Sequence, residues 1–153
     1  LCPWCFVGKR HLDLAVAQER PANLTIRYRP FMLYPHFDRA GHQFLDFFRQ
    51  KYGETLRVPM WDKIRAVAQP IGIDFAFEKM GWAPASLDGH RMIRFAGREK
   101  PGVEGQLIEA ITRAFYEEAR KVDNDLLVLE ASKLGVDAAK ARAYIESDAD
   151  IDD

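Results

Sequence analysis

One short segment of this 153-residue chain carries the clearest β-strand pattern. In residues 24–29, with the sequence LTIRYR, apolar and polar side chains alternate as they do in a half-buried strand. Residues 3–18 and most of the chain after residue 41 instead carry apolar side chains at helical spacing. A single strand does not stand alone, because its backbone groups need hydrogen-bond partners. We therefore expect residues 24–29 to pair with another chain or with strands absent from this sequence.

The chain contains two cysteines, Cys2 and Cys5, and both stand at the start of the first predicted helix. The unsatisfied N–H groups and the dipole of a helix N-terminus stabilise a thiolate, which is the reactive form of cysteine. One helical turn brings the second sulfur close to the first. Pro3 suits this first turn, where its missing N–H costs no helical hydrogen bond. The pattern predicts a dithiol–disulfide exchange site, in which an exposed Cys2 attacks and a better buried Cys5 resolves the mixed disulfide.

Two other interpretations of the cysteines are weaker. A pair of small core residues does not suit Cys2, which stands beside the chain end. A zinc site needs two further ligands, and the mutual spacing of His36 and His42 fits one. However, thirty residues separate Cys5 from His36, far more than a zinc finger needs. We therefore expect neither a metal ion nor an organic cofactor.

Composition and charge argue against several classes of function. The chain is 48% apolar and 29% charged with a net charge of −1, which is ordinary for a soluble globular domain. That balance gives no reason to expect nucleic acid or an anionic membrane as a partner. No apolar run approaches the roughly 20 residues that span a bilayer.

Helix signals dominate the rest of the chain. Ser86, Asp123 and Asp137 stand where N-cap residues are expected. The apolar spacing predicts helices near 42–52, from Pro59 to Pro70, and over 86–96, 104–120, 124–134 and 137–145. The aromatic side chains of Phe44, Phe47 and Phe48 are expected in the core rather than around a ligand.

Four motifs occur in order along the chain: CPWCFVGK at 2–9, RPFMLYP at 29–35, SLDGHR at 86–91, and AFYEE at 114–118 followed by DNDLLVL at 123–129. Together they resemble the DsbA-like branch of the thioredoxin superfamily, in the subfamily grouped with 2-hydroxychromene-2-carboxylate isomerase-like proteins. The resemblance implies an α/β, thioredoxin-like fold with a large all-helical insertion. We expect residues 1–36 to hold the active-site helix and one strand of the thioredoxin-like domain, and residues 37–153 to form the insertion.

The resemblance also implies parts that this sequence does not contain. The family has a strand before the cysteines and, after the insertion, a cis-proline loop, two strands and a helix. Here Leu1 directly precedes Cys2, and the chain stops at Asp153. We therefore expect the central, mostly helical part of a longer protein, and a cytoplasmic location by resemblance.

The expected function is thiol–disulfide exchange between the Cys2/Cys5 pair and protein, peptide or small-molecule thiols and disulfides, as in a DsbA-like oxidoreductase. Pro3 and Trp4 are expected to tune the thiolate, and Trp4 to contact the substrate from an exposed position. His90 lies in a motif of the resemblance and is expected either near the cysteines or as a structural histidine.

Two alternatives stay open at this point. A glutathione-dependent isomerase of the 2-hydroxychromene-2-carboxylate type is suggested by the subfamily, with glutathione as a possible cofactor. That branch typically has a serine in place of Cys2, so the retained cysteine argues against it. The other alternative is a non-catalytic helical module.

Overall fold

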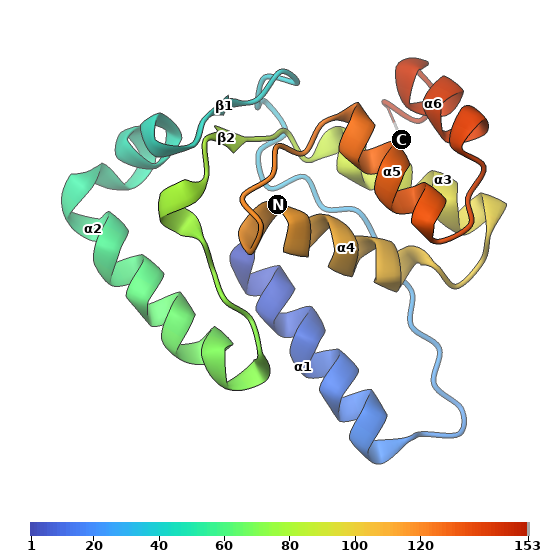
Figure 1. The fold of residues 1–153 in the computed structure, drawn as a ribbon, viewed down its shortest axis with the longest axis horizontal. Helices are drawn as coiled ribbons and strands as arrows, with labels where there is room; N and C mark the ends of the chain where they lie inside the picture. Colours follow the sequence, from blue (N-terminus) through green and yellow to red (C-terminus); the bar gives the residue numbers. More distant parts are fainter. Residues whose placement is uncertain (153) are drawn as a thin grey trace.

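The computed structural model describes residues 1–152, and their side chains except those of Glu54, Leu56 and Arg57. Its helices are α1 (Pro3–Glu19), α2 (Phe44–Ala68), α3 (Leu87–Glu99), α4 (Glu104–Tyr116), α5 (Asn124–Lys133) and α6 (Ala138–Glu146), shown in Figure 1. Two short 3-10 helices, η1 (Gln69–Ile71) and η2 (Phe77–Lys79), follow α2. Strands β1 (His42–Gln43) and β2 (Trp82–Ala83) pair antiparallel. None of the helices described is long and apolar enough to cross a membrane.

The helices enclose two hydrophobic cores, and α4 takes part in both. Helices α3, α4, α5 and α6 pack around one core (Figure 1). The other core lies where α1, α2, η2 and the end of α4 meet, and most of its large side chains are aromatic. The first turns of α1 therefore belong to the aromatic core. The predicted boundary at residue 36 stays a prediction, and Asp153 lies outside the described residues.

Residues 24–29 pair with no strand among the described residues, and the expectation of one strand within residues 1–36 stays a prediction, because its partners were expected outside this chain. Residues 22–33 form irregular chain between α1 and β1 (Figure 1). Leu24 is 46% exposed and Ile26 is 38% exposed. Among the described residues only β1 and β2 form a sheet, and they pair with each other, so residues 24–29 have no ladder partner there.

The expected architecture, mostly helical and matching a thioredoxin-like fold with a helical insertion, is confirmed.

Helix boundaries follow the local signals in part. Asp123 caps α5 by accepting the Leu126 N–H at 3.1 Å, and Asp137 caps α6 by accepting the Lys140 N–H at 2.9 Å. The helix predicted near 42–52 and the helix predicted from Pro59 both fall within α2, which consists of two helices joined by a kink at Gly53, where φ is 69° and ψ is 167°. The end predicted near residue 52 is therefore confirmed, whereas the second helix begins before Pro59, which lies inside it.

The buried guanidinium of Arg91 ties α3 to the end of α6. It is 2% exposed, and it forms an ion pair with Asp88 at 2.7 Å. It also donates hydrogen bonds to backbone carbonyls at the end of α6 and beyond it, namely those of Tyr144, Ile145, Ser147 and Ala149. This arginine satisfies the carbonyls that a helix leaves without partners at its C-terminus.

Candidate functional site

Cys2 and Cys5 occupy the first turn of α1. Cys2 is the N-cap residue, with φ −124° and ψ 123°, and Pro3 is the first helical residue. The Cys2 carbonyl accepts hydrogen bonds from the N–H groups of Cys5 at 3.1 Å and Phe6 at 3.3 Å. Both cysteines are free thiols in this structure. The predicted start of the helix and the place of Pro3 in its first turn are therefore confirmed.

The two thiols differ in acidity because they share a hydrogen bond. The Cys5 thiol, as the hydrogen-bond donor, is the main cause that lowers the pKa of Cys2 to about 5. Burial opposes this shift, while the backbone N–H groups of Cys5 and Trp4 support it. The same hydrogen bond, together with burial and the charge of the Cys2 thiolate, raises the pKa of Cys5. Cys2 therefore ionises first, and Cys5 keeps its proton.

The expected burial of the two cysteines is wrong, because Cys2 is half-buried and Cys5 is exposed. The face that α1 turns towards the aromatic core explains why Cys2 is more buried than Cys5. Phe6 and Val7 are the α1 side chains that enter the aromatic core, with exposures of 0% and 4%. Residues four apart share a helix face, so Cys2 lies on the same side as Phe6 while Cys5 is turned away.

An aromatic contact fixes the cysteine end of α1. The ring of Phe6 stacks on Tyr116 of α4, with 6.2 Å between centroids, and meets the ring of Phe75 edge to face at 6.1 Å. Burial raises the pKa of Tyr116, so its phenol stays protonated. The first turn of α1 is thereby held against the wall of the aromatic core.

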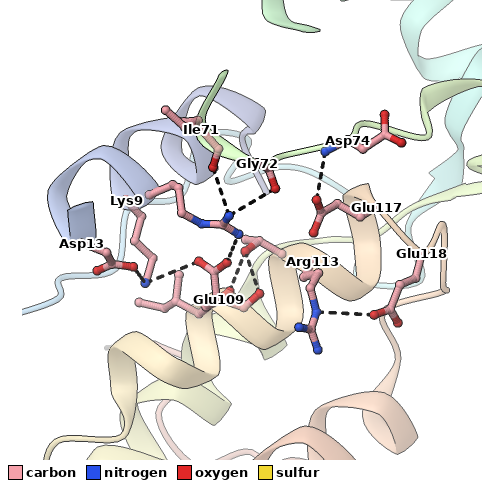
Figure 2. Close-up of polar contacts among 12 residues, drawn as sticks. Lys9, Asp13, Ile71, Gly72, Asp74, Glu109, Arg113, Glu117 and Glu118 are labelled. Atoms are coloured by element: carbon pink, nitrogen blue, oxygen red, sulfur yellow. Dashed lines mark hydrogen bonds and ion pairs between the residues drawn. The ribbon is translucent and has the colours of Figure 1, made fainter. Parts of the chain in front are cut away.

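A polar clamp fixes α1 one turn further along (Figure 2). Arg10 donates hydrogen bonds at 3.3 Å to the carbonyls of Ile71 and Gly72 and forms an ion pair with Glu109 of α4. Lys9 reaches the same Glu109 carboxylate at 3.5 Å and also pairs with Asp13 of its own helix. Sequence reasoning missed this clamp, because Lys9 and Glu109 are 100 positions apart and no local pattern links them.

A cavity of about 150 Å³ opens beside Cys2. Its described lining includes Cys2, Pro3 and Trp4 on one side and mainly aromatic side chains elsewhere, among them Tyr34, Phe37, Phe44, Phe47, Phe48, Tyr52, Trp61 and Tyr116. The expectation that the phenylalanines at 44, 47 and 48 only fill the core is thus incomplete. Phe44 is 3% exposed and belongs to the core, yet all three also line this cavity.

The remaining predicted site residues are Pro3, Trp4 and His90, and the structure brings only the first two to the cysteines. Pro3 and Trp4 lie at the cavity with Cys2, and Trp4 is exposed as expected. His90 is half-buried on α3, with its Nε2 atom 3.2 Å from the carbonyl oxygen of Phe31, and it is not among the described residues that line the cavity. Burial lowers the pKa of His90.

Metal binding finds no support in the arrangement of the ligand types. Within the described residues, no three His, Cys, Asp or Glu side chains are grouped so that they could hold a metal ion. The chemistry that the site offers is that of two thiols of unequal acidity at a helix start, beside an aromatic cavity.

Comparisons with known proteins show which chains this one resembles. An uncharacterised protein of Bacillus subtilis (strain 168), YwbO, is 24% identical over 148 residues, which cover 96% of this chain and 68% of that protein. A crystal structure of the probable DsbA oxidoreductase SCO1869 from Streptomyces coelicolor superposes with a TM-score of 0.85 at 27% identity. That match covers 97% of this chain but only 64% of the Streptomyces chain. The family model of the DSBA-like thioredoxin domain matches residues 1–153, and the chain therefore belongs to that family.

Proposed function

We propose that this chain carries the redox centre of a thiol–disulfide oxidoreductase, which exchanges a Cys2–Cys5 disulfide with protein, peptide or small-molecule dithiols. The observation that carries the proposal is the placement of Cys2 as the N-cap residue of α1, one helical turn from the Cys5 thiol, where the pKa of Cys2 is lowered to about 5. A thiolate stabilised in this way is both a nucleophile and a good leaving group near neutral pH. Family membership supports the same class of chemistry.

The exchange proceeds in two steps that each make and break one bond. The Cys2 thiolate attacks one sulfur of a substrate disulfide, and the other substrate sulfur leaves with the electron pair as a thiolate. Cys5 then gives its proton to solvent, attacks the Cys2 sulfur and releases the second substrate thiolate. The products are a reduced substrate and a Cys2–Cys5 disulfide, and the reverse sequence oxidises a dithiol.

We infer that the oxidising direction is favoured. The shared hydrogen bond and the helix N–H groups stabilise the Cys2 thiolate, and hence the reduced form of the pair. A couple whose reduced form is stabilised is a stronger oxidant. Trp4, 44% exposed beside the cysteines, is the side chain best placed to contact a bound polypeptide. We propose a structural role for His90, since its ring holds the Phe31 backbone.

The test uses single cysteine variants and a reduced peptide that contains two cysteines. Oxidised wild-type protein should convert the peptide to its disulfide, and Cys2→Ser should abolish the reaction. Treated with a disulfide reagent, Cys5→Ser should accumulate a mixed disulfide in which Cys2 has attacked one reagent sulfur and the other has left as a thiolate, visible as an added mass on the intact protein. Full peptide oxidation by Cys2→Ser, or an adduct trapped on Cys5 of Cys2→Ser but not on Cys2 of Cys5→Ser, would contradict the assignment.

A further inference from the structure

We propose that the cavity beside Cys2 and the ammonium group of Lys51 form a substrate subsite. This subsite favours disulfides in which an apolar or aromatic group carries a carboxylate. The inference rests on the proposed function and adds the class of substrate that the same site prefers. It makes Lys51 a specificity-determining residue for the attack by Cys2.

The cavity itself selects for an apolar group. Its volume of about 150 Å³ is of the size that accepts a single benzene ring in a protein interior. Among the described residues that line it, none is Asp, Glu, Lys or Arg. Cys2 and Trp4 form part of the wall, so a ring bound here lies next to the attacking sulfur. A group attached to a disulfide sulfur could therefore occupy the cavity while that disulfide meets Cys2.

Lys51 of α2 places a positive charge at the rim of this cavity. Its Nζ atom lies 3.7 Å from the ring centroid of Tyr34, 5.4 Å from that of Tyr52 and 5.9 Å from that of Phe47. It also donates a hydrogen bond to the Tyr34 hydroxyl. All three aromatic residues line the cavity. Cation–π contacts hold an ammonium group in place without neutralising it, and Lys51 is exposed, so it can still meet an anion from solution.

The two charges of the site have opposite effects on an acidic substrate. The Cys2 thiolate repels a negatively charged disulfide as it approaches, since like charges near each other raise the energy of the encounter. The Lys51 ammonium offsets that repulsion when the carboxylate lies at the rim and the apolar group fills the cavity. A partly exposed ion pair of this kind changes a rate by about three- to fivefold, and the effect weakens with salt.

Two aromatic disulfide reagents of similar size differ in charge, so a comparison of their reaction rates isolates the effect of the substrate's charge. The rings of dithiobis(nitrobenzoate) carry carboxylates, whereas those of dithiodipyridine carry no charge near neutral pH. With either reagent, the Cys2 thiolate attacks one sulfur and the S–S bond breaks, so that one aromatic thiolate leaves with the electron pair. Cys5 then loses its proton to solvent, attacks Cys2 and releases the second aromatic thiolate. The released thiolates absorb light, so stopped-flow absorbance gives both rate constants directly.

The measured quantity is the ratio of the rate constants for the acidic and the neutral reagent, in reduced protein at low salt. A change in folding or in the acidity of Cys2 affects both reagents and cancels in the ratio. We expect Lys51→Met to lower the ratio about three- to fivefold, and Lys51→Arg to retain it. Lys63→Met, which removes another exposed lysine of α2, should leave the ratio unchanged. Added salt should lower the wild-type ratio towards that of Lys51→Met.

The possible outcomes separate this inference from the proposed function. An unchanged ratio in Lys51→Met, or an equal drop in Lys63→Met, would refute the subsite while leaving the redox function intact. Wild-type protein that reacts with both reagents no faster than a free thiol would overturn the proposed function and the subsite together. A lower ratio confined to Lys51→Met supports both.

Discussion

Replacing Cys2 by serine should remove a pH-dependent part of the stability of the reduced protein. The pKa of Cys2 is about 5 in the fold, whereas a free thiol has a pKa of about 8.5. Between these values the folded chain has lost the Cys2 proton and the unfolded chain still holds it. By proton linkage, the free energy of unfolding therefore rises with pH across this window, and the contribution is lost as the pH falls through about 5.

The size of the effect follows from the same linkage. A full difference of one proton changes the free energy of unfolding by about 1.4 kcal/mol per pH unit. Between about pH 6 and pH 8 this amounts to about 2.7 kcal/mol. Cys2 is only half-buried, so we halve this figure for solvent screening, to about 1.3 kcal/mol. Cys5, whose pKa is raised, keeps its proton in the folded chain, and most unfolded chains also keep it below about pH 8.5, so its contribution over this range is small.

Urea unfolding under reducing conditions at the two pH values measures this difference directly. Wild type should gain about 1.3 kcal/mol more than Cys2→Ser between the lower and the higher pH, because all other ionisable groups are common to both proteins. Cys5→Ser should show a smaller gain than wild type, since the Cys5 thiol is the main stabiliser of the Cys2 thiolate. Equal pH dependence in wild type and Cys2→Ser would refute the reasoning, because the fold would then not stabilise the thiolate.

Two further predictions concern the contacts that hold the site and the fold together. Glu109→Gln should lower the free energy of unfolding by about 1–2 kcal/mol in urea denaturation, because Lys9 and Arg10 lose their shared carboxylate on α4. Asp13→Asn, which affects a pair within α1, should cost less than about 0.5 kcal/mol, and equal losses would argue against the clamp. Arg91→Met should cost about 3–5 kcal/mol, since Asp88 and the carbonyls at the end of α6 lose their donor. A loss below about 1 kcal/mol would show that these groups find other partners.

Local signals in the sequence predicted what a few neighbouring residues decide among themselves. Asp123 and Asp137 were expected as N-caps, and each accepts the N–H three residues later. The cysteine pair with Pro3 between them was expected at a helix start, and it opens α1. Each of these features depends on the backbone within one helical turn, so a short stretch of sequence contains all the information. The ordered motifs were also sufficient to indicate the family.

Features that depend on distant parts of the chain could not be predicted in this way. Residues 24–29 have a strand's alternation, but alternation supplies no ladder partner, and they are irregular in the described structure. The helix predicted near 42–52 does end at Gly53, but the helix that follows begins ahead of Pro59, where it was expected to start. In both cases the local preference is clear, and contacts with other parts of the chain decide how far the strand or the helix extends.

The sequence by itself therefore determined the chemistry available to this protein, which is two thiols on one helical turn, and the helices that carry it. Only the tertiary structure decided that Cys2 rather than Cys5 is the more covered thiol, because that depends on which face of α1 Phe6 turns towards Tyr116. The aromatic cavity likewise combines side chains of α1, α2, η2 and α4 with those of the segment before α2, and Lys51 of α2 adds its charge at the rim. The side chains that form this site are far apart in sequence and come together only through packing, so a local sequence pattern does not predict the site.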